Sequence, residues 1–588
     1  MLKAIGKATD SIVFIAQDSA ITDSSGGHHG IRFYYSADGC SLVYCKIKYG
    51  NATDGDEFSR TLDDYGGGIC CTHSSPTIAN STICKNSAQY FGGGIYCSYN
   101  SNPVIFNNTI TRNYGVFGGA IACVDNSNPT ISHNSIRNNL SGNNGGGIYC
   151  YAYSNPVISD NIMIENMTRI RRSGGGICCF YRSSPIIINN VISNDTAHNG
   201  GGIACFYNSN PIISNNIITW NMVGWRGAGI YCLDSSPLIE RNYICENHAG
   251  FFGGGIYCYS YFPTISKNVI KRNSAYYGGG GISCDYSTTI ISDNLIIENI
   301  GGDAGGGILC WRCNANLLNN ILVENSSVFG VAIHCYYSNL NILNNTIVMN
   351  SADSSGGGLN VHGRCNVKIL NTIFWDNSSD EGEDILVRPR RDYSLFIAHT
   401  VIDSNKCCFK GSGMVIWGPR NIDDNPLFAD TLFHLSASSP CIDAGTKYMY
   451  IPAFDTVLLA PRYDFEGGVR PYGGDWDIGA DEYGACEIFE QAIFKPQTYR
   501  IFAYPNPFNS SCFIKVPADA KIEIYDLKGN IIKKFGSALA NELIVREQIY
   551  DSNQLYIWTP GRSVSSGIYL IRAMVGDRIM TKRIVFIK

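Results

Sequence analysis

Residues 200–226, GGGIACFYNSNPIISNNIITWNMVGWR, are one copy of a unit that decides how most of this chain folds. The aliphatic residue that follows the glycines recurs twelve times, at steps of 25 to 29 residues. Twelve copies in register indicate a repeat architecture in which each unit packs on its neighbours. The recurring positions are Ile69, Ile95, Ile121, Ile148, Ile177, Ile203, Ile230, Ile256, Ile282, Ile308, Ile333 and Leu359.

Each unit contains three short β-type stretches, centred in this copy on Ile203, Ile213 and Ile218, and no helical periodicity. Such a unit cannot bury its own apolar side chains, so it must stack on copies of itself. The simplest arrangement is a coil with three strands per turn, each paired in parallel with the equivalent strand of the next coil. The sequence therefore predicts a parallel β-helix.

A cysteine stands two residues after the aliphatic position in eleven consecutive units. Side chains alternate along a strand, so both residues point inward. Buried cysteine behaves as a small hydrophobic residue, and we interpret this column as core packing rather than as a catalytic or metal-binding set. Its members are Cys71, Cys97, Cys123, Cys150, Cys179, Cys205, Cys232, Cys258, Cys284, Cys310 and Cys335.

Asparagine forms two further columns, which we predict at the turns between strands. Asparagine tolerates left-handed backbone geometry, bonds its own main chain, and in a stack can bond along the axis. The first column is Asn108, Asn134, Asn161, Asn190, Asn216, Asn242, Asn268, Asn294, Asn320, Asn345 and Asn371. The second includes Asn86, Asn113, Asn139, Asn166, Asn221, Asn247, Asn273, Asn299, Asn325 and Asn350.

The Gly-Gly-(Gly/Ala)-Ile strings, paired with Ile-x-x-Asn strings such as Ile110 to Asn113, resemble right-handed parallel β-helix repeat proteins. They are also similar to the repeats of chlamydial polymorphic outer membrane proteins, which are surface-exposed adhesins. The resemblance covers about residues 10 to 421. It implies an all-β fold: a right-handed parallel β-helix of about 14–15 coils with a period of about 26 residues.

The two ends of the β-helix, residues 1–421, receive separate predictions. The first residues already read as coil, so we expect the chain to begin inside the β-helix, without its N-terminal cap and export signal. Residues 422–484 resemble the closing segment of bacterial secreted β-helix proteins, on strings such as Asn425-Pro-Leu-Phe and Asp477-Ile-Gly-Ala-Asp-Glu-Tyr483. Asp475, Asp477, Asp481 and Glu482 could hold Ca²⁺, but we favour a solvated acidic turn.

Residues 501–588 read as a separate module after a linker at 485–500. Ala503-Tyr-Pro-Asn-Pro-Phe508 opens it, β-type stretches follow at 512–516, 521–525 and 531–535, and the sequence between the last two predicts a hairpin. The module resembles the type A C-terminal sorting domain of the type IX secretion system. That resemblance implies an immunoglobulin-like β-sandwich, recognition by the type IX machinery, and a secreted or outer-membrane surface-attached protein.

Charge and composition exclude several classes of function. The chain has a formal net charge of −5 and only 16% charged residues. The last 88 residues hold 12 Lys and Arg against 7 Asp and Glu, so the first 500 residues are the more acidic part. This balance disfavours a nucleic-acid partner, and no apolar run is long enough for a transmembrane helix.

Cysteines outside the column give few disulfide candidates. We expect Cys70 and Cys178 to point outward, too far apart to be bridged. Cys441 and Cys486 are a possible pair in the closing segment.

Candidates for chemistry are sparse. The position before the second asparagine column carries Glu246, Arg272 and Glu298 in consecutive units, which we interpret mainly as a surface ion-pair ladder. Glu298 and Glu324 lie one unit apart, where like charges can raise one pKa, and are the weak catalytic candidates. No cofactor motif and no metal-ligand spacing is found.

Aromatic residues next to the cysteine column form the candidate binding surface. Strips of aromatic rings can stack on sugars or bury a partner, although stabilisation of the β-helix alone is the favoured interpretation. Tyr149, Tyr231 and Tyr257 are expected to point outward as well. The candidate residues are Tyr151, Phe180, Tyr181, Phe206, Tyr207, Tyr259, Trp311 and Tyr336.

From these patterns we predict a secreted or cell-surface β-helix that acts as a binding or adhesion module, with a glycan or a host cell surface as possible partner. A polysaccharide lyase or glycoside hydrolase is the alternative, because fold alone does not decide function.

Overall fold

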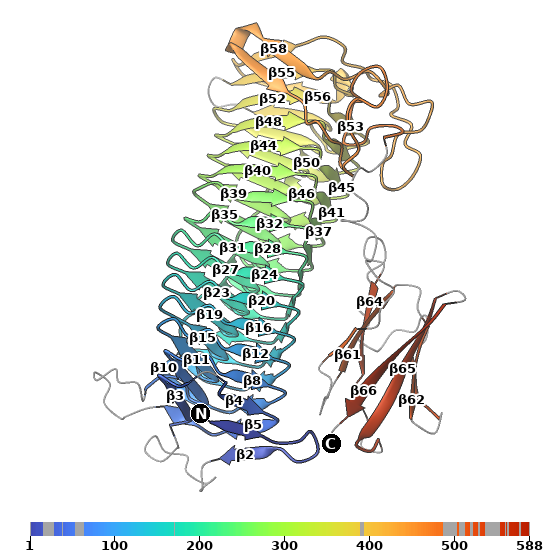
Figure 1. Ribbon diagram of the computed structural model, residues 1–588. Helices are drawn as coiled ribbons and strands as arrows, with labels where there is room; N and C mark the ends of the chain where they lie inside the picture. Colours follow the sequence, from blue (N-terminus) through green and yellow to red (C-terminus); the bar gives the residue numbers. More distant parts are fainter. Residues whose placement is uncertain are drawn as a thin grey trace. The chain divides into compact units, whose positions relative to one another are not determined.

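The computed structural model describes most of the repeats and the strands of the C-terminal module (Figure 1). The described residues are 2–15, 29–37, 39–52, 64–169, 171–388, 393–485, 502–504, 512–517, 521–526, 530–535, 553–558, 560, 564–575 and 578–586. The chain forms two compact units. One comprises Met1–Asn139, Pro156–Met163 and Gln491–Lys588, and the other Leu140–Asn155 and Ile164–Glu490.

One coil of the repeat contains four strands. In the copy quoted above they are β27 (Ile203–Phe206), β28 (Ile212–Ser214), β29 (Ile217–Thr219) and β30 (Met222–Arg226). Each belongs to a different parallel sheet, and we number these sheets 1 to 4 in that order. The fold is a parallel β-solenoid of about 13 turns, which confirms the predicted parallel β-helix with slightly fewer turns than the 14–15 expected.

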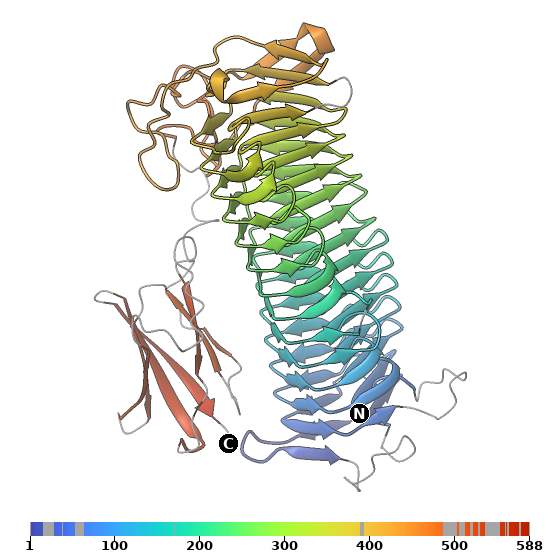
Figure 2. The same cartoon turned by 180° about the vertical axis from the view of Figure 1, so that it is seen from behind.

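The sheets run through equivalent strands of successive coils (Figures 1 and 2). Sheet 1 has 15 described strands, from β3 (Ile31–Tyr34) to β56 (Cys407–Phe409). Sheet 2 has 16, from β1 (Lys3–Ile5) to β57 (Met414–Trp417), and sheet 3 has 14, from β2 (Ile12–Ile15) to β53 (Ile373–Trp375). Sheet 4, from β6 (Asn51–Ala52) to β50 (Ser351–Ser355), has 12 strands and is additional to the three predicted per coil.

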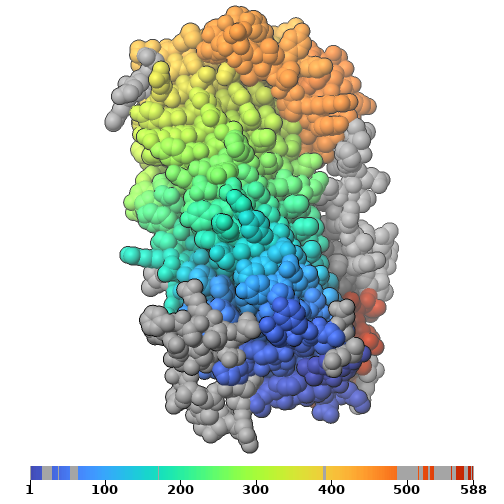
Figure 3. Space-filling model, turned by 60° about the vertical axis from the view of Figure 1, so that its left-hand side comes forward, coloured from blue at the N-terminus to red at the C-terminus, as the bar shows by residue number. Residues whose placement is uncertain are grey.

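Pairing between coils is in register, so each sequence column becomes a column in space. Ile203 pairs with Ile230, and Cys205 with Cys232. All eleven column cysteines are fully buried, as are Ile213 and Ile218. Consecutive coils follow one another as bands of colour on the surface (Figure 3). The core is therefore built of columns of similar apolar side chains, to which each coil adds one layer.

The asparagine columns are buried hydrogen-bond ladders. Asn247 accepts hydrogen bonds from the main-chain N–H of Asn221 (3.0 Å) and from Asn221 Nδ2 (2.9 Å). Its own Nδ2 donates to the carbonyls of Ile218 (2.9 Å) and Cys245 (3.1 Å) and to Asn273 Oδ1 (2.9 Å). Each ladder asparagine thus joins its own coil to both neighbouring coils.

Left-handed backbone geometry lies mainly one residue before each ladder position, rather than on the ladder residue as we expected. Glu246, for example, has φ 54° and precedes Asn247. Asn371 was wrongly placed in the first ladder: it has φ 50°, and Thr372 takes the ladder position, where its Oγ1 accepts from the N–H of Asn345 (3.4 Å). The gap in the second column after Asn166 is filled by Asp195.

A third ladder, of serines, was not predicted. The N–H of Ser154 donates to Ser183 Oγ (3.2 Å), and the N–H of Ser183 donates to Ser209 Oγ (3.2 Å). These serines belong to the Ser-x-Pro strings between sheets 1 and 2. The same type of hydrogen bond therefore secures this turn as well.

The positions expected to point outward between the Ile and Cys columns are covered by other residues, so they are buried and not exposed to solvent. Tyr149 is 3% exposed, Tyr257 is 0% exposed and Tyr231 is likewise buried; Cys70 and Cys178 are 3% and 0% exposed. The ends of the sheet 4 strands and the glycines that follow them cover this row. At the end of β30, Arg226 Nη1 donates to the Tyr257 hydroxyl (2.9 Å).

The closing segment packs on the last coils. Asn371 Nδ2 donates to the carbonyl of Thr446 (2.8 Å), and the N–H of Ala480 donates to Thr346 Oγ1 (3.0 Å). The segment includes the antiparallel pair β58 (Tyr448–Ile451) and β59 (Thr456–Leu459). Two short 3₁₀ helices, Ser404–Lys406 and Pro452–Phe454, lie before and between these elements.

The expected solvated acidic turn is wrong for Asp477 and Glu482, which are each 2% exposed. The carboxylate of Asp477 accepts from the N–H groups of Asp443 and Tyr483 (2.7 Å each). Glu482 lies 3.7 Å from the buried guanidinium of Arg470. These acidic side chains hold loops together, and within the described ranges no group of three or more His, Cys, Asp or Glu could hold a metal ion.

The C-terminal module contains two small antiparallel sheets. One joins β60 (Phe502–Tyr504), β61 (Cys512–Pro517) and β64 (Asn553–Trp558). The other joins β63 (Ile531–Phe535), β62 (Lys521–Asp526), β65 (Gly567–Val575) and β66 (Arg578–Phe586).

The predicted hairpin is β62 with β63. Ile514 and Trp558 of the first sheet share a hydrophobic core with the second. The immunoglobulin-like topology stays a prediction, as do the domain boundaries.

Some predictions lie outside the described residues: Cys486 and the string from Pro505 to Phe508. Cys441 is buried and is a free thiol in the described structure. No helix found in the described ranges has the length and apolarity to cross a membrane.

Candidate functional site

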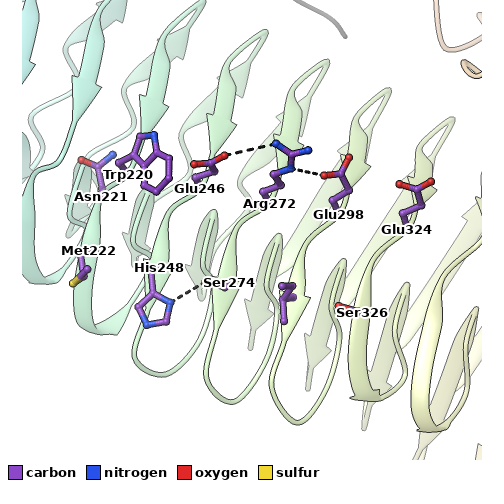
Figure 4. A pocket seen from close by; sticks show the side chains of 11 residues that line it. Trp220, Asn221, Met222, Glu246, His248, Arg272, Ser274, Glu298, Glu324 and Ser326 are labelled. Carbon is purple, nitrogen blue, oxygen red and sulfur yellow. Dashed lines mark hydrogen bonds and ion pairs between the residues drawn. The ribbon is translucent and has the colours of Figure 1, made fainter. Parts of the chain in front are cut away.

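A groove of about 690 Å³ lies where sheet 3 turns into sheet 4 (Figure 4). It extends over five consecutive coils and has two rows of side chains, which we call the turn row and the strand row. The turn row precedes the second asparagine ladder and consists of Trp220, Glu246, Arg272, Glu298 and Glu324. The strand row follows the ladder and consists of Met222, His248, Ser274, Ile300 and Ser326.

The repeat itself explains why these rows face solvent. Trp220, Glu246 and Arg272 have φ values of 59°, 54° and 51°, so the chain bends sharply at each of them. The following ladder asparagine turns inward, and the residue after it turns outward again at the start of a sheet 4 strand. Every coil therefore presents one side chain on either side of the ladder (Figure 4).

Ion pairs join the middle of the turn row. Arg272 lies between two carboxylates: its Nη1 is 3.9 Å from Glu246 Oε1, and its Nε bonds Glu298 Oε2. Lys271, which is buried at the end of β37 (Val269–Lys271), reaches Glu298 Oε1 at 3.1 Å. This arrangement confirms the interpretation of an alternating ion-pair ladder.

The two carboxylates differ in their proton affinity. Burial raises the pKa of Glu246 above its ordinary value, and Arg272 only partly offsets this effect. Burial also acts on Glu298, but hydrogen bonds from Arg272 and Lys271 outweigh it, so the pKa of Glu298 is lowered. We expected two like charges to raise one pKa at this position, and for Glu298 the shift has the opposite sign.

A hydrolytic role needs one protonated and one ionised carboxyl group on either side of a bound sugar. The groove brings Glu298 and Glu324 to adjacent coils, but Glu298 already holds two cations. Between Glu246 and Glu298, the space is filled by Arg272. The side chains therefore form a charged binding surface more readily than an acid–base pair.

The aromatic candidates lie at a different corner, between sheets 1 and 2. Tyr151, Phe180 and Phe206 end strands of sheet 1, and their rings follow one another at centroid distances of 6.1 and 5.6 Å. Tyr181 and Tyr207 follow in the turn and are 44% exposed, whereas Phe206 is only 8% exposed. Further along, the same column contains Tyr259, Trp311 and Tyr336. The ring centroids of Trp311 and Tyr336 are 4.2 Å apart.

The repeats match the family described as "Right handed beta helix region" over residues 8–192 and 168–320. The chain belongs to this right-handed β-helix family. The end of this β-helix protein, residues 502–588, matches the family described as "Secretion system C-terminal sorting domain". The protein is therefore secreted or attached to the outer-membrane surface, and its sorting domain implies the type IX secretion machinery as partner. Neither curated proteins nor solved structures give a significant match to it.

Sequence reasoning missed most of the groove in this β-helix. Trp220, Met222, His248 and Ile300 received no role, although each stands directly before or after a residue of the second asparagine column. Reading both flanking positions of that column across coils would have found them. The column position of Trp220 is the one that supplied Glu246, Arg272 and Glu298.

Proposed function

We propose that this exported β-helix is a binding or adhesion module and that the corner between sheets 1 and 2 holds an extracellular glycan. The observation that carries the proposal is the exposure of tyrosine rings on nearby coils. Tyr153, Tyr181 and Tyr207 are 46%, 44% and 44% exposed, although an aromatic side chain gains most by burial.

The guanidinium group of Arg182 adds a cationic donor to this corner. It lies 5.7 Å from the ring centroid of Tyr153 and 5.8 Å from that of Tyr181, and its Nη1 donates to the Tyr153 hydroxyl (2.8 Å). Rings held in this way keep a fixed orientation, which reduces the entropy lost when a ligand stacks on them. Sugar rings have apolar faces and many hydroxyl groups, and both match this surface.

The test uses the full chain and a panel of immobilised glycans. We expect one or more glycans to be bound, and the double variant Tyr181→Ala, Tyr207→Ala to lose about tenfold or more in affinity. Tyr276→Ala removes a more exposed ring (66%) elsewhere and is the matched control, which should bind normally. The proposal is refuted if the double variant binds every glycan of the panel as well as the wild type does.

The alternative, a polysaccharide lyase or glycoside hydrolase, is tested on the same glycans by the release of new reducing ends. Release that disappears in Glu298→Gln or Glu324→Gln would replace the binding function with an enzymatic one.

A further inference from the structure

We propose that the groove between sheets 3 and 4 is a second binding site, for an unbranched neutral oligosaccharide chain. This inference does not depend on the aromatic corner, because the two surfaces share no residue and lie at different turns of the coil. It rests on the shape of the groove, its exposed apolar side chains, its carboxylate acceptors, its saturated main chain and its excess of negative charge.

The shape of the groove fits an extended chain. The turn row and the strand row each repeat once per coil, and parallel strands are about 4.8 Å apart, so five coils give a length of about 19 Å. Each coil offers the same two positions on either side of the ladder (Figure 4). A polymer that lies along the rows can contact one side chain of each row at every coil, whereas a compact ligand would leave most of the groove empty.

Apolar side chains in the groove are unusually exposed. Trp220 is 52% exposed, Met222 is 56% and Ile300 is 53%, and all three line the groove. Trp220 and Met222 lie together at one end (Figure 4). The flat face of an indole ring is well suited to stack on the apolar face of a sugar ring.

Hydrogen-bond acceptors face the same space. The carboxylates of Glu246, Glu298 and Glu324 line the groove, and the side chains of Glu246 and Glu298 are 23% and 25% exposed. Sugar hydroxyl groups can donate hydrogen bonds to these carboxylates, and such bonds are stronger than those to a neutral acceptor.

A peptide strand finds no pairing edge here. In the strand row, the N–H of His248 donates to Asn221 (2.9 Å), that of Ser274 to Asn247 (2.9 Å), and that of Ile300 to Asn273 (2.9 Å). Strand addition requires unpaired main-chain groups at a sheet edge. Recognition must therefore use side chains, which suits a sugar chain better than an extended peptide.

Charge selects among glycans. Three carboxylates line the groove, and the guanidinium of Arg272 is the cation exposed beside them. The buried ammonium group of Lys271 forms an ion pair with Glu298. The groove therefore has an excess of negative charge, which repels uronate and sulfate groups. A neutral oligosaccharide is the class of ligand that meets all five conditions.

Titration calorimetry with the full chain tests this assignment. The probes are cellohexaose, xylohexaose and chitohexaose as neutral chains, with oligogalacturonate and hexalysine as charged ones. We expect at least one neutral chain to bind, Trp220→Ala to weaken binding about tenfold, and Glu246→Gln to weaken it severalfold. Trp220→Phe should restore part of the affinity.

Two controls separate this site from the aromatic corner and from folding defects. Trp417→Ala removes another exposed tryptophan (43%) outside the groove and should bind as the wild type does. The double variant Tyr181→Ala, Tyr207→Ala should bind the neutral chain in the groove with the affinity of the wild type. Either binding proposal can therefore be refuted while the other stands. The proposal is overturned if no neutral chain binds, if Trp220→Ala binds equally well, or if oligogalacturonate or hexalysine is preferred.

Discussion

Replacing Asp195 with asparagine should stabilise the β-helix, because this is the position at which the second ladder carries a carboxylate in place of an amide. Asp195 is fully buried. Its Oδ1 accepts from the N–H (2.6 Å) and the Nδ2 (3.1 Å) of Asn166, and its own N–H donates to Asn221 Oδ1 (3.0 Å). The other oxygen, Oδ2, is buried without a hydrogen-bond partner in the described structure.

The expected gain can be bounded in two ways. If Asp195 stays ionised, the substitution removes an unsatisfied buried acceptor, worth about 1–3 kcal/mol, and adds amide hydrogen bonds of about 1 kcal/mol each. If it is protonated in the folded state, an ordinary carboxyl group must take up a proton at pH 7, at a cost of up to about 4 kcal/mol. Both routes predict a gain of about 2–4 kcal/mol for Asp195→Asn at pH 7.

The gain should depend on pH with a defined sign. Burial raises the pKa of Asp195 well above its ordinary value. The folded state then binds more protons than the unfolded state, so the wild type loses stability as pH rises from about 4 through the folded-state pKa. The advantage of Asp195→Asn should therefore be large at pH 7 and small near pH 4.

Hydrogen exchange measured by mass spectrometry on peptides around Asp195 provides the assay. A gain of about 2 kcal/mol corresponds to exchange slower by roughly 30-fold where local opening limits it. Asn221→Asp is the mirror control, since it places the same defect one coil further on and should accelerate exchange there. Equal or faster exchange in Asp195→Asn at pH 7 would show that an amide and a carboxylate are equivalent in the ladder.

Three further outcomes are expected. Asn247→Ala removes five buried hydrogen bonds and should cost about 3–5 kcal/mol in the free energy of unfolding; an unchanged denaturation midpoint would contradict the ladder's role. Gly253→Ala should lower the thermal midpoint, because Gly253 has φ 68° and a Cβ there would lie 2.6 Å from the Ile256 carbonyl oxygen; a midpoint equal to that of the wild type would refute this. Hydrogen bonds with Glu466 and Asp430 raise the pKa of His434 to about 10, so its contribution to stability is complete below its ordinary pKa and lost as pH rises toward 10. His434→Gln should reduce this loss of stability, by at most about 1 kcal/mol because the side chain is partly exposed. The prediction is excluded if the free energy of unfolding changes by the same amount between pH 7 and pH 10 in the variant and in the wild type.

The period of the sequence was enough to predict the β-helix, because columns such as Cys205 and Cys232 can coincide only if the coils stack in register. Sheet 4 escaped prediction because its strands vary in length, from two residues in β34 (His248–Ala249) to five in β30 (Met222–Arg226), and have no recurring large aliphatic residue. The buried state of Tyr257 also escaped, since alternation tells which way a side chain points but not that Arg226 and its neighbours lie over it.

The groove could be predicted only in part, for a related reason. The charges of Glu246, Arg272 and Glu298 were visible as a column, and their pairing followed from the coil spacing. Trp220 was not assigned to that column, because one aromatic residue among charged ones has no periodicity of its own. The exposure of Trp220 depends on its own left-handed backbone geometry. We expected that geometry on the following residue, the ladder asparagine.

The stacked thiols in the core impose an order of events on export. The protein is exported to an environment in which cysteines are readily oxidised. A hydrogen bond with Cys232, together with burial, raises the pKa of the Cys258 thiol, which makes it unreactive. That protection exists only after the coils have closed around the column. Before then, eleven evenly spaced thiols on an extended chain can join in many wrong pairs. Coil formation must therefore be faster than thiol oxidation, and the speed of winding, rather than any bond within the finished coil, keeps the column reduced.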